Sequence, residues 1–185
     1  MKTYLSIAGV VFTLLTLGSF FGCQSNPEAP EPTPTLVCDI TMGNPADNDD
    51  NGFVGGYLLA ASEVMASDKT IYRIGVKLSS ATNFACAIYD DNNGEPNNML
   101  AESGVIAGTA GWNEATIPAT ALTNGNTYWI VAISENTGIR DQDNVGSNMR
   151  LTYSWPTVAG SGMPTEQTGW VSGAFEMKLY GVTCQ

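Results

Sequence analysis

Oxygen-bearing side chains alternate along one short stretch of the chain, Asp47-Asn48-Asp49-Asp50-Asn51-Gly52. Carboxylate and amide oxygens at alternate positions, followed by a glycine, match the first half of a calcium-binding loop, in which successive ligands point toward one ion. The second half does not match, because Leu58 stands where a bidentate glutamate belongs. The pattern predicts a structural calcium ion held by Asp47, Asp49, Asp50 and Asn51. A solvated acidic turn is the alternative.

Two further acidic stretches follow, Asp90-Asp91-Asn92-Asn93-Gly94 and Arg140-Asp141-Gln142-Asp143-Asn144. The first has the composition of a tight turn between two strands. In the second, Arg140 can neutralise the neighbouring carboxylates, which disfavours a metal ion there. We therefore expect calcium, if it binds, at the earlier stretch.

A binding site for sugars is the second chemical prediction. Trp155 and Trp170 flank a connection over residues 156–169 that is rich in glycine and proline, and long loops on rigid scaffolds often carry function. Their rings could stack on sugar rings, while Arg140, Asp141 and Asp143 could reach hydroxyl groups if both connections emerge at the same end of the domain. Capping of the hydrophobic core by the two indoles is the alternative.

Catalysis finds little support in the residues. The chain has no histidine, which excludes Ser-His-Asp and Cys-His arrangements. Glu63, Glu114, Glu135 and Glu176 could supply the two carboxylates of a glycoside hydrolase, but none lies in a recognisable signature. With 7 basic and 18 acidic residues the formal net charge is −11, so nucleic acid is not an expected partner. We expect a protein that is not an enzyme.

The elements that carry these residues begin with a leader. Met1-Lys2 precedes an apolar run from Tyr4 to Phe21, which ends in Gly22-Cys23. This is the layout of a bacterial export signal. The cysteine resembles that of the lipobox in bacterial lipoproteins, whose thiol is acylated before the signal is removed. The resemblance implies that Cys23 carries the lipid and that the rest of the chain lies outside the cytoplasm, anchored in the cell envelope. An uncleaved membrane anchor is the alternative.

Three parts of the chain follow from this interpretation. Residues 1–22 form the signal peptide, and residues 23–35 form a tether that begins at the lipidated cysteine. The tether contains four prolines at short spacing, which favour extended polyproline geometry. Residues 36–185 have the common size of one domain with one core.

Three cysteines lie within this domain. An exported chain meets oxidising conditions, so pairing is expected. Cys38 lies near the start of the domain and Cys184 near its end, so they would meet if the first and last strands were neighbours. Cys86 shares a strand face with Phe84 and Ile88, which predicts a buried free thiol.

Alternation of apolar and polar residues indicates an all-β domain. Residues 72–78, 149–155 and 175–180 alternate, while residues 84–89 and 127–134 are more continuously apolar, as in central strands. Many short strands separated by turns predict an antiparallel β-sandwich, with a jelly roll as the expected arrangement. One short helix is predicted over residues 98–102, and residues 156–169 are predicted to be a loop.

The order of several motifs resembles jelly-roll modules attached to secreted bacterial enzymes and surface proteins. These motifs are Tyr89-Asp90, Gly94-Glu95-Pro96, Gly111-Trp112 and the run from Gly125 to Trp129. The resemblance implies an accessory, carbohydrate-binding-like domain, in which Trp112 and Trp129 serve packing. The favoured function is non-catalytic binding of a glycan at the cell surface. The alternative is a structural or adhesive protein that binds another protein or assembles with itself.

Overall fold

The structure is a computed structural model that describes residues 37–48 and 51–184. The predicted signal peptide, Cys23 and the tether lie outside the described residues, as do two of the predicted calcium ligands, Asp49 and Asp50. Within the described ranges, no helix has the length and apolar character needed to cross a bilayer.

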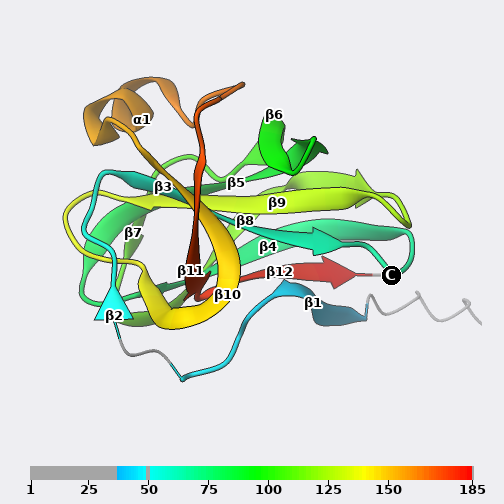
Figure 1. Cartoon of the computed structure of the whole chain (residues 1–185), viewed down its shortest axis with the longest axis horizontal. Coiled ribbons are helices and arrows are strands. Elements are labelled where there is room, and N and C mark those ends of the chain that lie inside the picture. Colours follow the sequence, from blue (N-terminus) through cyan, green and yellow to red (C-terminus); the bar gives the residue numbers. More distant parts are fainter. Residues whose placement is uncertain (1–36, 49–50, 185) are drawn as a thin grey trace, which may run out of the picture. The chain divides into compact units, whose positions relative to one another are not determined.

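Two antiparallel sheets form the domain, as predicted (Figure 1). Sheet A has the order β1 (Cys38–Gly43), β12 (Leu179–Cys184), β4 (Lys69–Leu78) and β8 (Gly111–Leu122). Sheet B has the order β11 (Val171–Met177), β10 (Arg140–Thr152), β3 (Tyr57–Val64), β9 (Thr127–Ser134), β5 (Thr82–Asn92) and β6 (Glu95–Glu102). Two short strands complete sheet B: β2 (Asn51–Gly52) pairs with β10, and β7 (Ile106–Gly108) pairs with β5. The all-β sandwich is confirmed, and the jelly-roll arrangement stays a prediction.

The main core lies between the sheets and is built from alternate residues of their strands. In β4 it receives Ile74, Val76 and Leu78, as the alternation predicted. A β-bulge between Ile71 and Arg73 shifts the phase of this strand, so Ile71 enters the core in place of Tyr72. A bulge inserts one extra residue and moves the side chains beyond it to the other face.

A second core covers the outer face of sheet B. Here α1 (Trp155–Ser161) and the residues that follow it pack against β3, β5 and β9, on the side away from β1 and β12 (Figure 1). Its buried members are Leu58, Ala60, Ala85, Ala87, Tyr89, Trp129, Val131, Ile133, Trp155, Val158, Met163 and Trp170. Sheet B is therefore buried on both faces, which is why β5 and β9 read as nearly continuous apolar runs.

Two local predictions were wrong. Residues 98–102, expected to form a helix, belong to β6, because they pair with β5 on one edge. On the other edge of β6, the segment after α1 approaches, and the Met99 amide donates to the Thr165 carbonyl. The loop expected over residues 156–169 begins with α1. Pro156 lies in its first turn and Gly162, with φ of 83°, ends it, which is the usual placement of these residues at helix ends.

The chain turns the corner between the sheets at one residue. Only Lys178 separates β11 in sheet B from β12 in sheet A. Lys178 is fully buried, and its Nζ donates to Asn48 Oδ1 at 2.8 Å and lies 3.5 Å from Glu176 Oε2. The hydrogen bond from the charged Lys178 to Asn48 therefore joins the segment after β1 to the point where the chain passes from sheet B to sheet A.

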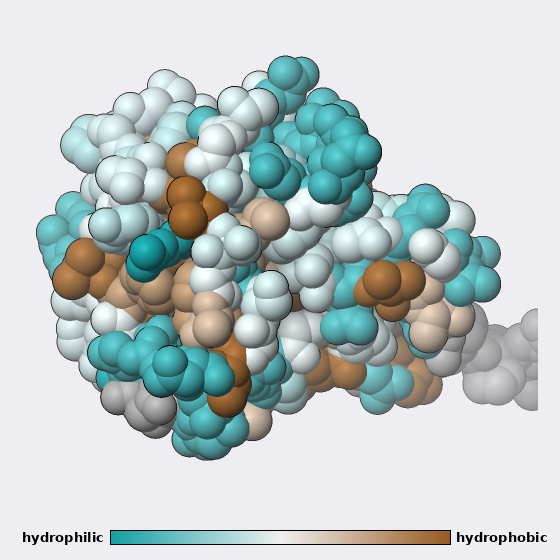
Figure 2. Space-filling model, viewed as in Figure 1, coloured by the Kyte–Doolittle hydropathy of each residue, from teal (hydrophilic) through white to brown (hydrophobic). Residues whose placement is uncertain are grey.

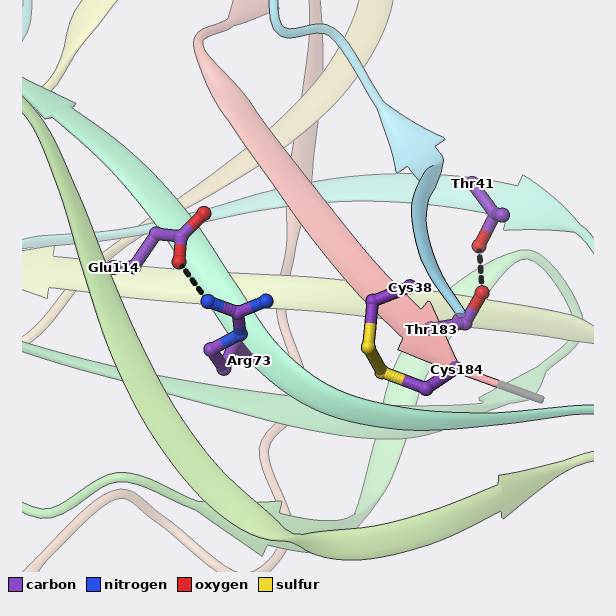
Figure 3. Close-up of a disulfide and its surroundings, with 6 residues drawn as sticks. All are labelled: Cys38, Thr41, Arg73, Glu114, Thr183 and Cys184. Carbon is purple, nitrogen blue, oxygen red and sulfur yellow. Dashed lines mark hydrogen bonds and ion pairs between the residues drawn. A yellow bond between two sulfur atoms is a disulfide. The ribbon is translucent and has the colours of Figure 1, made fainter. Parts of the chain in front are cut away.

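The predicted disulfide joins Cys38 to Cys184, across the pairing of β1 with β12 (Figure 3). Beside it, the hydroxyls of Thr41 and Thr183 are hydrogen-bonded at 2.8 Å. Cys86 is the buried free thiol that its position on β5 predicted. Burial raises its pKa to about 12, so it stays protonated at neutral pH.

Candidate functional site

Two acidic stretches that are about ninety residues apart meet at one corner of the sandwich. Asn51 of β2 pairs with Asp141 of β10, and the Asn51 side-chain amide donates to Asp143 Oδ2 at 2.9 Å. Three residues earlier in the sequence, Asn48 Nδ2 donates to Gln142 Oε1 at 2.7 Å. The sequence offered no link between the two stretches, because their contact depends on the pairing of β2 with β10.

A cavity of about 210 Å³ opens at this meeting point, which we call the corner pocket. It is lined by Asn51, Gly52, Phe53, Asp141, Asp143 and Arg150. Asp141 is only 1 % exposed, whereas Asp143 is exposed at the rim. In the surface view, hydrophilic residues gather near β2, and a hydrophobic patch lies beside them (Figure 2). The pocket therefore offers carboxylates at two depths, one of them shielded from water.

Aromatic rings hold Arg150 at the wall of the corner pocket. Its guanidinium carbon lies 5.5 Å from the ring centroid of Phe53 and 5.9 Å from that of Phe175, which is cation–π geometry. The two rings meet edge to face at 5.0 Å. Arg150 also lines a neighbouring hollow of about 340 Å³ with Tyr57, Leu151, Thr152 and Val171. The exposed Arg150 side chain thus lines two openings.

The chemistry of the corner pocket suits a ligand rich in hydroxyl groups. Asp141 and Asp143 accept hydrogen bonds, Arg150 donates them, and the Phe53 ring supplies an apolar wall. Phe53, Asn51 and Arg150 were not among the predicted sugar-binding residues. The signal was weak, since Phe53 follows a glycine in an acidic stretch and Arg150 lies on an alternating strand.

Arg140, the remaining member of the predicted polar set, is the first residue of β10 and pairs with Gly52. Its carbonyl accepts the Lys178 amide at 2.9 Å. Arg140 does not line the corner pocket, so Asp141 and Asp143 are the part of this set that the pocket unites.

The two tryptophans predicted to stack on sugars lie elsewhere. Trp155 is 8 % exposed and Trp170 is 7 % exposed, and both belong to the second core under α1. Trp170 Nε1 donates to the Gln167 carbonyl at 3.2 Å. The structure thus matches the alternative of core capping, because the outer face of sheet B is apolar and these rings cover it.

Two of the predicted calcium ligands, Asp47 and Asn51, form hydrogen bonds with different parts of the domain. Asp47 Oδ1 accepts from Lys77 Nζ and from Trp112 Nε1, each at 2.9 Å, so this carboxylate faces sheet A. Across the described part of the chain, no three His, Cys, Asp or Glu side chains are grouped so that they could hold a metal ion. Because Asp49 and Asp50 lie outside that part, calcium binding stays a prediction.

No family model, no curated protein and no solved structure matches this chain.

Proposed function

We propose that this chain is a membrane-anchored surface lipoprotein whose β-sandwich binds a glycan without catalysis, in the corner pocket. The observation that carries the proposal is the composition of that pocket, which is lined by the polar side chains of Asp141, Asp143 and Arg150. The aromatic ring of Phe53 lines it beside them and lies under the Arg150 guanidinium. Groups of this kind satisfy the many hydroxyls of a sugar while its apolar ring face meets Phe53. A volume of about 210 Å³ is below the roughly 300–1,000 Å³ of pockets for drug-sized ligands, which favours one sugar ring or the end of a chain.

Features of the domain support display outside the cytoplasm. The Cys38–Cys184 disulfide is typical of oxidising compartments. The chain enters the sandwich at Cys38, and Cys184 pairs with Thr70 near the start of β4. At the other end of β4, Leu78 bridges to Ile139, two residues before Asp141. The corner pocket therefore lies toward the end of sheet A opposite the Cys38–Cys184 disulfide.

Retention on insoluble polysaccharides and a glycan array test this proposal. We expect the native protein to be retained by at least one glycan, and Asp143→Asn to weaken retention roughly tenfold or more, because a hydrogen bond to a charged group contributes about 1.5–3 kcal/mol. Asp39→Asn is the matched control, since Asp39 is an exposed aspartate on β1. Absence of retention on every glycan, or equal loss in both variants, would contradict the proposal.

Calcium is proposed as a structural ion of the acidic stretch from Asp47 to Asn51, with Asp47, Asp49, Asp50 and Asn51 as its predicted ligands. The support is compositional, since oxygen ligands at alternate positions suit this ion. We expect the melting temperature of the native protein to be higher in added calcium than in chelator, and Asp49→Ala to remove the difference. Equal melting of the native protein in both conditions would remove the metal from this account.

An adhesive role is the competing function, and one observation favours it. Strand β11 forms an edge of sheet B, and its first four residues, Val171 to Ala174, carry no charge and no proline to block pairing with another strand. Concentration-dependent assembly of the protein, together with no retention on any glycan, would favour this function over sugar binding.

A further inference from the structure

Aromatic and charged side chains gather on the outer face of sheet A, away from both cores. We call this group the sheet A platform, and its members are Asp47, Arg73, Lys77, Trp112, Glu114 and Tyr180. The alternation of β8 turns Ala115 and Ile117 into the main core and leaves Trp112 and Glu114 on the outer face. Trp112, for which the resemblance to jelly-roll modules implied a packing role, is half-buried.

A missing side chain makes room for the first ring of the platform. Gly75 pairs with Tyr180 on one side and with Glu114 on the other, and the Tyr180 ring lies across it. A Cβ atom on Gly75 would stand 2.2 Å from that ring. The Tyr180 hydroxyl reaches Glu114 Oε1 at 2.9 Å. Burial, and then the hydrogen bond to Glu114, raise the pKa of Tyr180 to about 12, so the hydroxyl donates at neutral pH.

The second ring is fixed from three sides. The Trp112 and Tyr180 ring centroids are 4.9 Å apart, with the planes inclined at 51°. Trp112 Nε1 donates to Asp47, and the Lys77 ammonium lies 5.9 Å from the Trp112 ring. At the other end of the platform, Arg73 and Glu114 point toward each other and pair at 2.7 Å (Figure 3).

The hydrogen bonds and ring contacts that fix the platform side chains are not needed to build either hydrophobic core. The platform fills neither core, and exposed ion pairs such as Arg73–Glu114 contribute little net stability, since ordering long side chains opposes them. A glycine within a strand weakens it, and often marks a place where another group approaches closely. Trp, Tyr and Arg, held rigid before binding, are the residues that contribute most to recognition.

The platform and the corner pocket are joined by one short segment. Asp47 belongs to the platform and Asn51 lines the pocket. The two residues are four positions apart, so their α-carbons lie within about 14 Å of each other whatever path the chain takes between them. A chain of several sugars is long enough to span that distance and so to contact both places.

We propose that the sheet A platform is a second subsite of the same glycan, so that an extended neutral sugar chain contacts both the platform and the corner pocket. This inference rests on the proposed function. Trp112 supplies the stacking surface, while Glu114 and Arg73 lie beside it as acceptor and donor. The ligand is neutral because a chain with a formal net charge of −11 repels uronic-acid and sulfated polymers.

Calorimetric titration with neutral hexasaccharides and the matching disaccharides, cellohexaose, mannohexaose and xylohexaose among them, tests the inference. We expect at least one hexasaccharide to bind more than tenfold tighter than its disaccharide. Trp112→Ala should remove that advantage and leave disaccharide affinity within twofold of native. Trp112→Phe, which keeps a ring, should retain most of it. Leu100→Ala, an exposed apolar change on β6, is the control and should alter neither affinity.

The outcomes separate the two proposals. If Asp143→Asn weakens binding of both sugars while Trp112→Ala leaves hexasaccharide affinity unchanged, the platform is not a subsite and the glycan function stands. If no hexasaccharide or disaccharide binds the native protein, both proposals fail. If Trp112→Ala unfolds the protein, Trp112→Leu decides, because it keeps an apolar side chain and removes the stacking ring. A tenfold loss of hexasaccharide affinity in Trp112→Leu, with disaccharide affinity kept, supports the platform. Native hexasaccharide affinity in Trp112→Leu, or loss of both affinities, would overturn it.

Discussion

Removal of the disulfide between Cys38 and Cys184 should strongly destabilise the domain. Cys38 and Cys184 are 146 residues apart, so the bond closes nearly the whole domain into one loop. In the chain-entropy model a loop of this length lowers the entropy of the unfolded chain enough to contribute about 5 kcal/mol at 25 °C. A domain of this size has a total stability of roughly 5–15 kcal/mol. The bond therefore accounts for a large share of the stability.

The structure adds a local reason for the same effect. Strand β1 lies at the edge of sheet A, where it pairs with β12, and a register shift between Ile40 and Met42 interrupts that pairing. Without the covalent link, β1 would be held by few hydrogen bonds and by burial of Met42. We expect the end of the domain at Cys38 to open first when the bond is reduced.

Urea denaturation followed by tryptophan fluorescence measures this prediction. The double variant Cys38→Ser/Cys184→Ser should lose about 3–5 kcal/mol of unfolding free energy, and its melting temperature should fall by on the order of 10 °C. Cys86→Ala is the control, because it removes a thiol and leaves the disulfide intact. A loss below about 1 kcal/mol in the double variant would refute the reasoning from loop closure.

Three further predictions concern the packing and the titrating groups. Gly75→Ala should lower the unfolding free energy by about 1–3 kcal/mol, because the new methyl meets the Tyr180 ring at 2.2 Å. Gly160→Ala, which has open space around it and lies in α1, should not lower the unfolding free energy in the same urea titration. Stability should fall as pH rises above about 9, because the folded state keeps the protons of Cys86 and Tyr180, whose pKa values are each raised to about 12, while the unfolded chain releases them from 9.0 and 10.0. Cys86→Ala should flatten this decline, and a stability that stays constant to pH 11 would contradict it. Trp170→Ala should lower stability by about 3–5 kcal/mol; a variant that melts like the native protein would show that the second core does not depend on this ring.

Patterns that depend on neighbours in the sequence were predicted well. The alternation of residues 175–179 put Phe175, Met177 and Leu179 in the main core, as observed. The Asn93-Gly94 turn joins β5 to β6 with φ of 56° and 84°, which is the geometry that this pair of residues favours between strands. The disulfide followed from the positions of two cysteines at the ends of the domain.

Features that depend on distant pairing could not be predicted. The bulge in β4 exchanges Tyr72 for Ile71 in the core, and no residue type at that position signals it. Lys178 alternates as an outward residue of a strand, yet it is buried because the chain changes sheets there. The corner pocket needs β2 to pair with β10, and the platform needs Trp112 and Tyr180 to become neighbours through β4. Each is a consequence of strand order, which a single sequence does not state.

The indole and side-chain amide signals of the protein give the most direct test of glycan binding at the proposed place. The four tryptophans report from two regions, since Trp112 lies on the platform and Trp129, Trp155 and Trp170 lie in the second core. The side-chain amide of Asn51 reports from a third region, the corner pocket. In a titration with the tightest-binding neutral hexasaccharide, observed by two-dimensional nitrogen–proton magnetic resonance, we predict that the signals of Asn51 and Trp112 shift and saturate together. The signals of Trp155 and Trp170 should remain in place. Shifts confined to Trp155 and Trp170, or no shift with any hexasaccharide, would contradict the account.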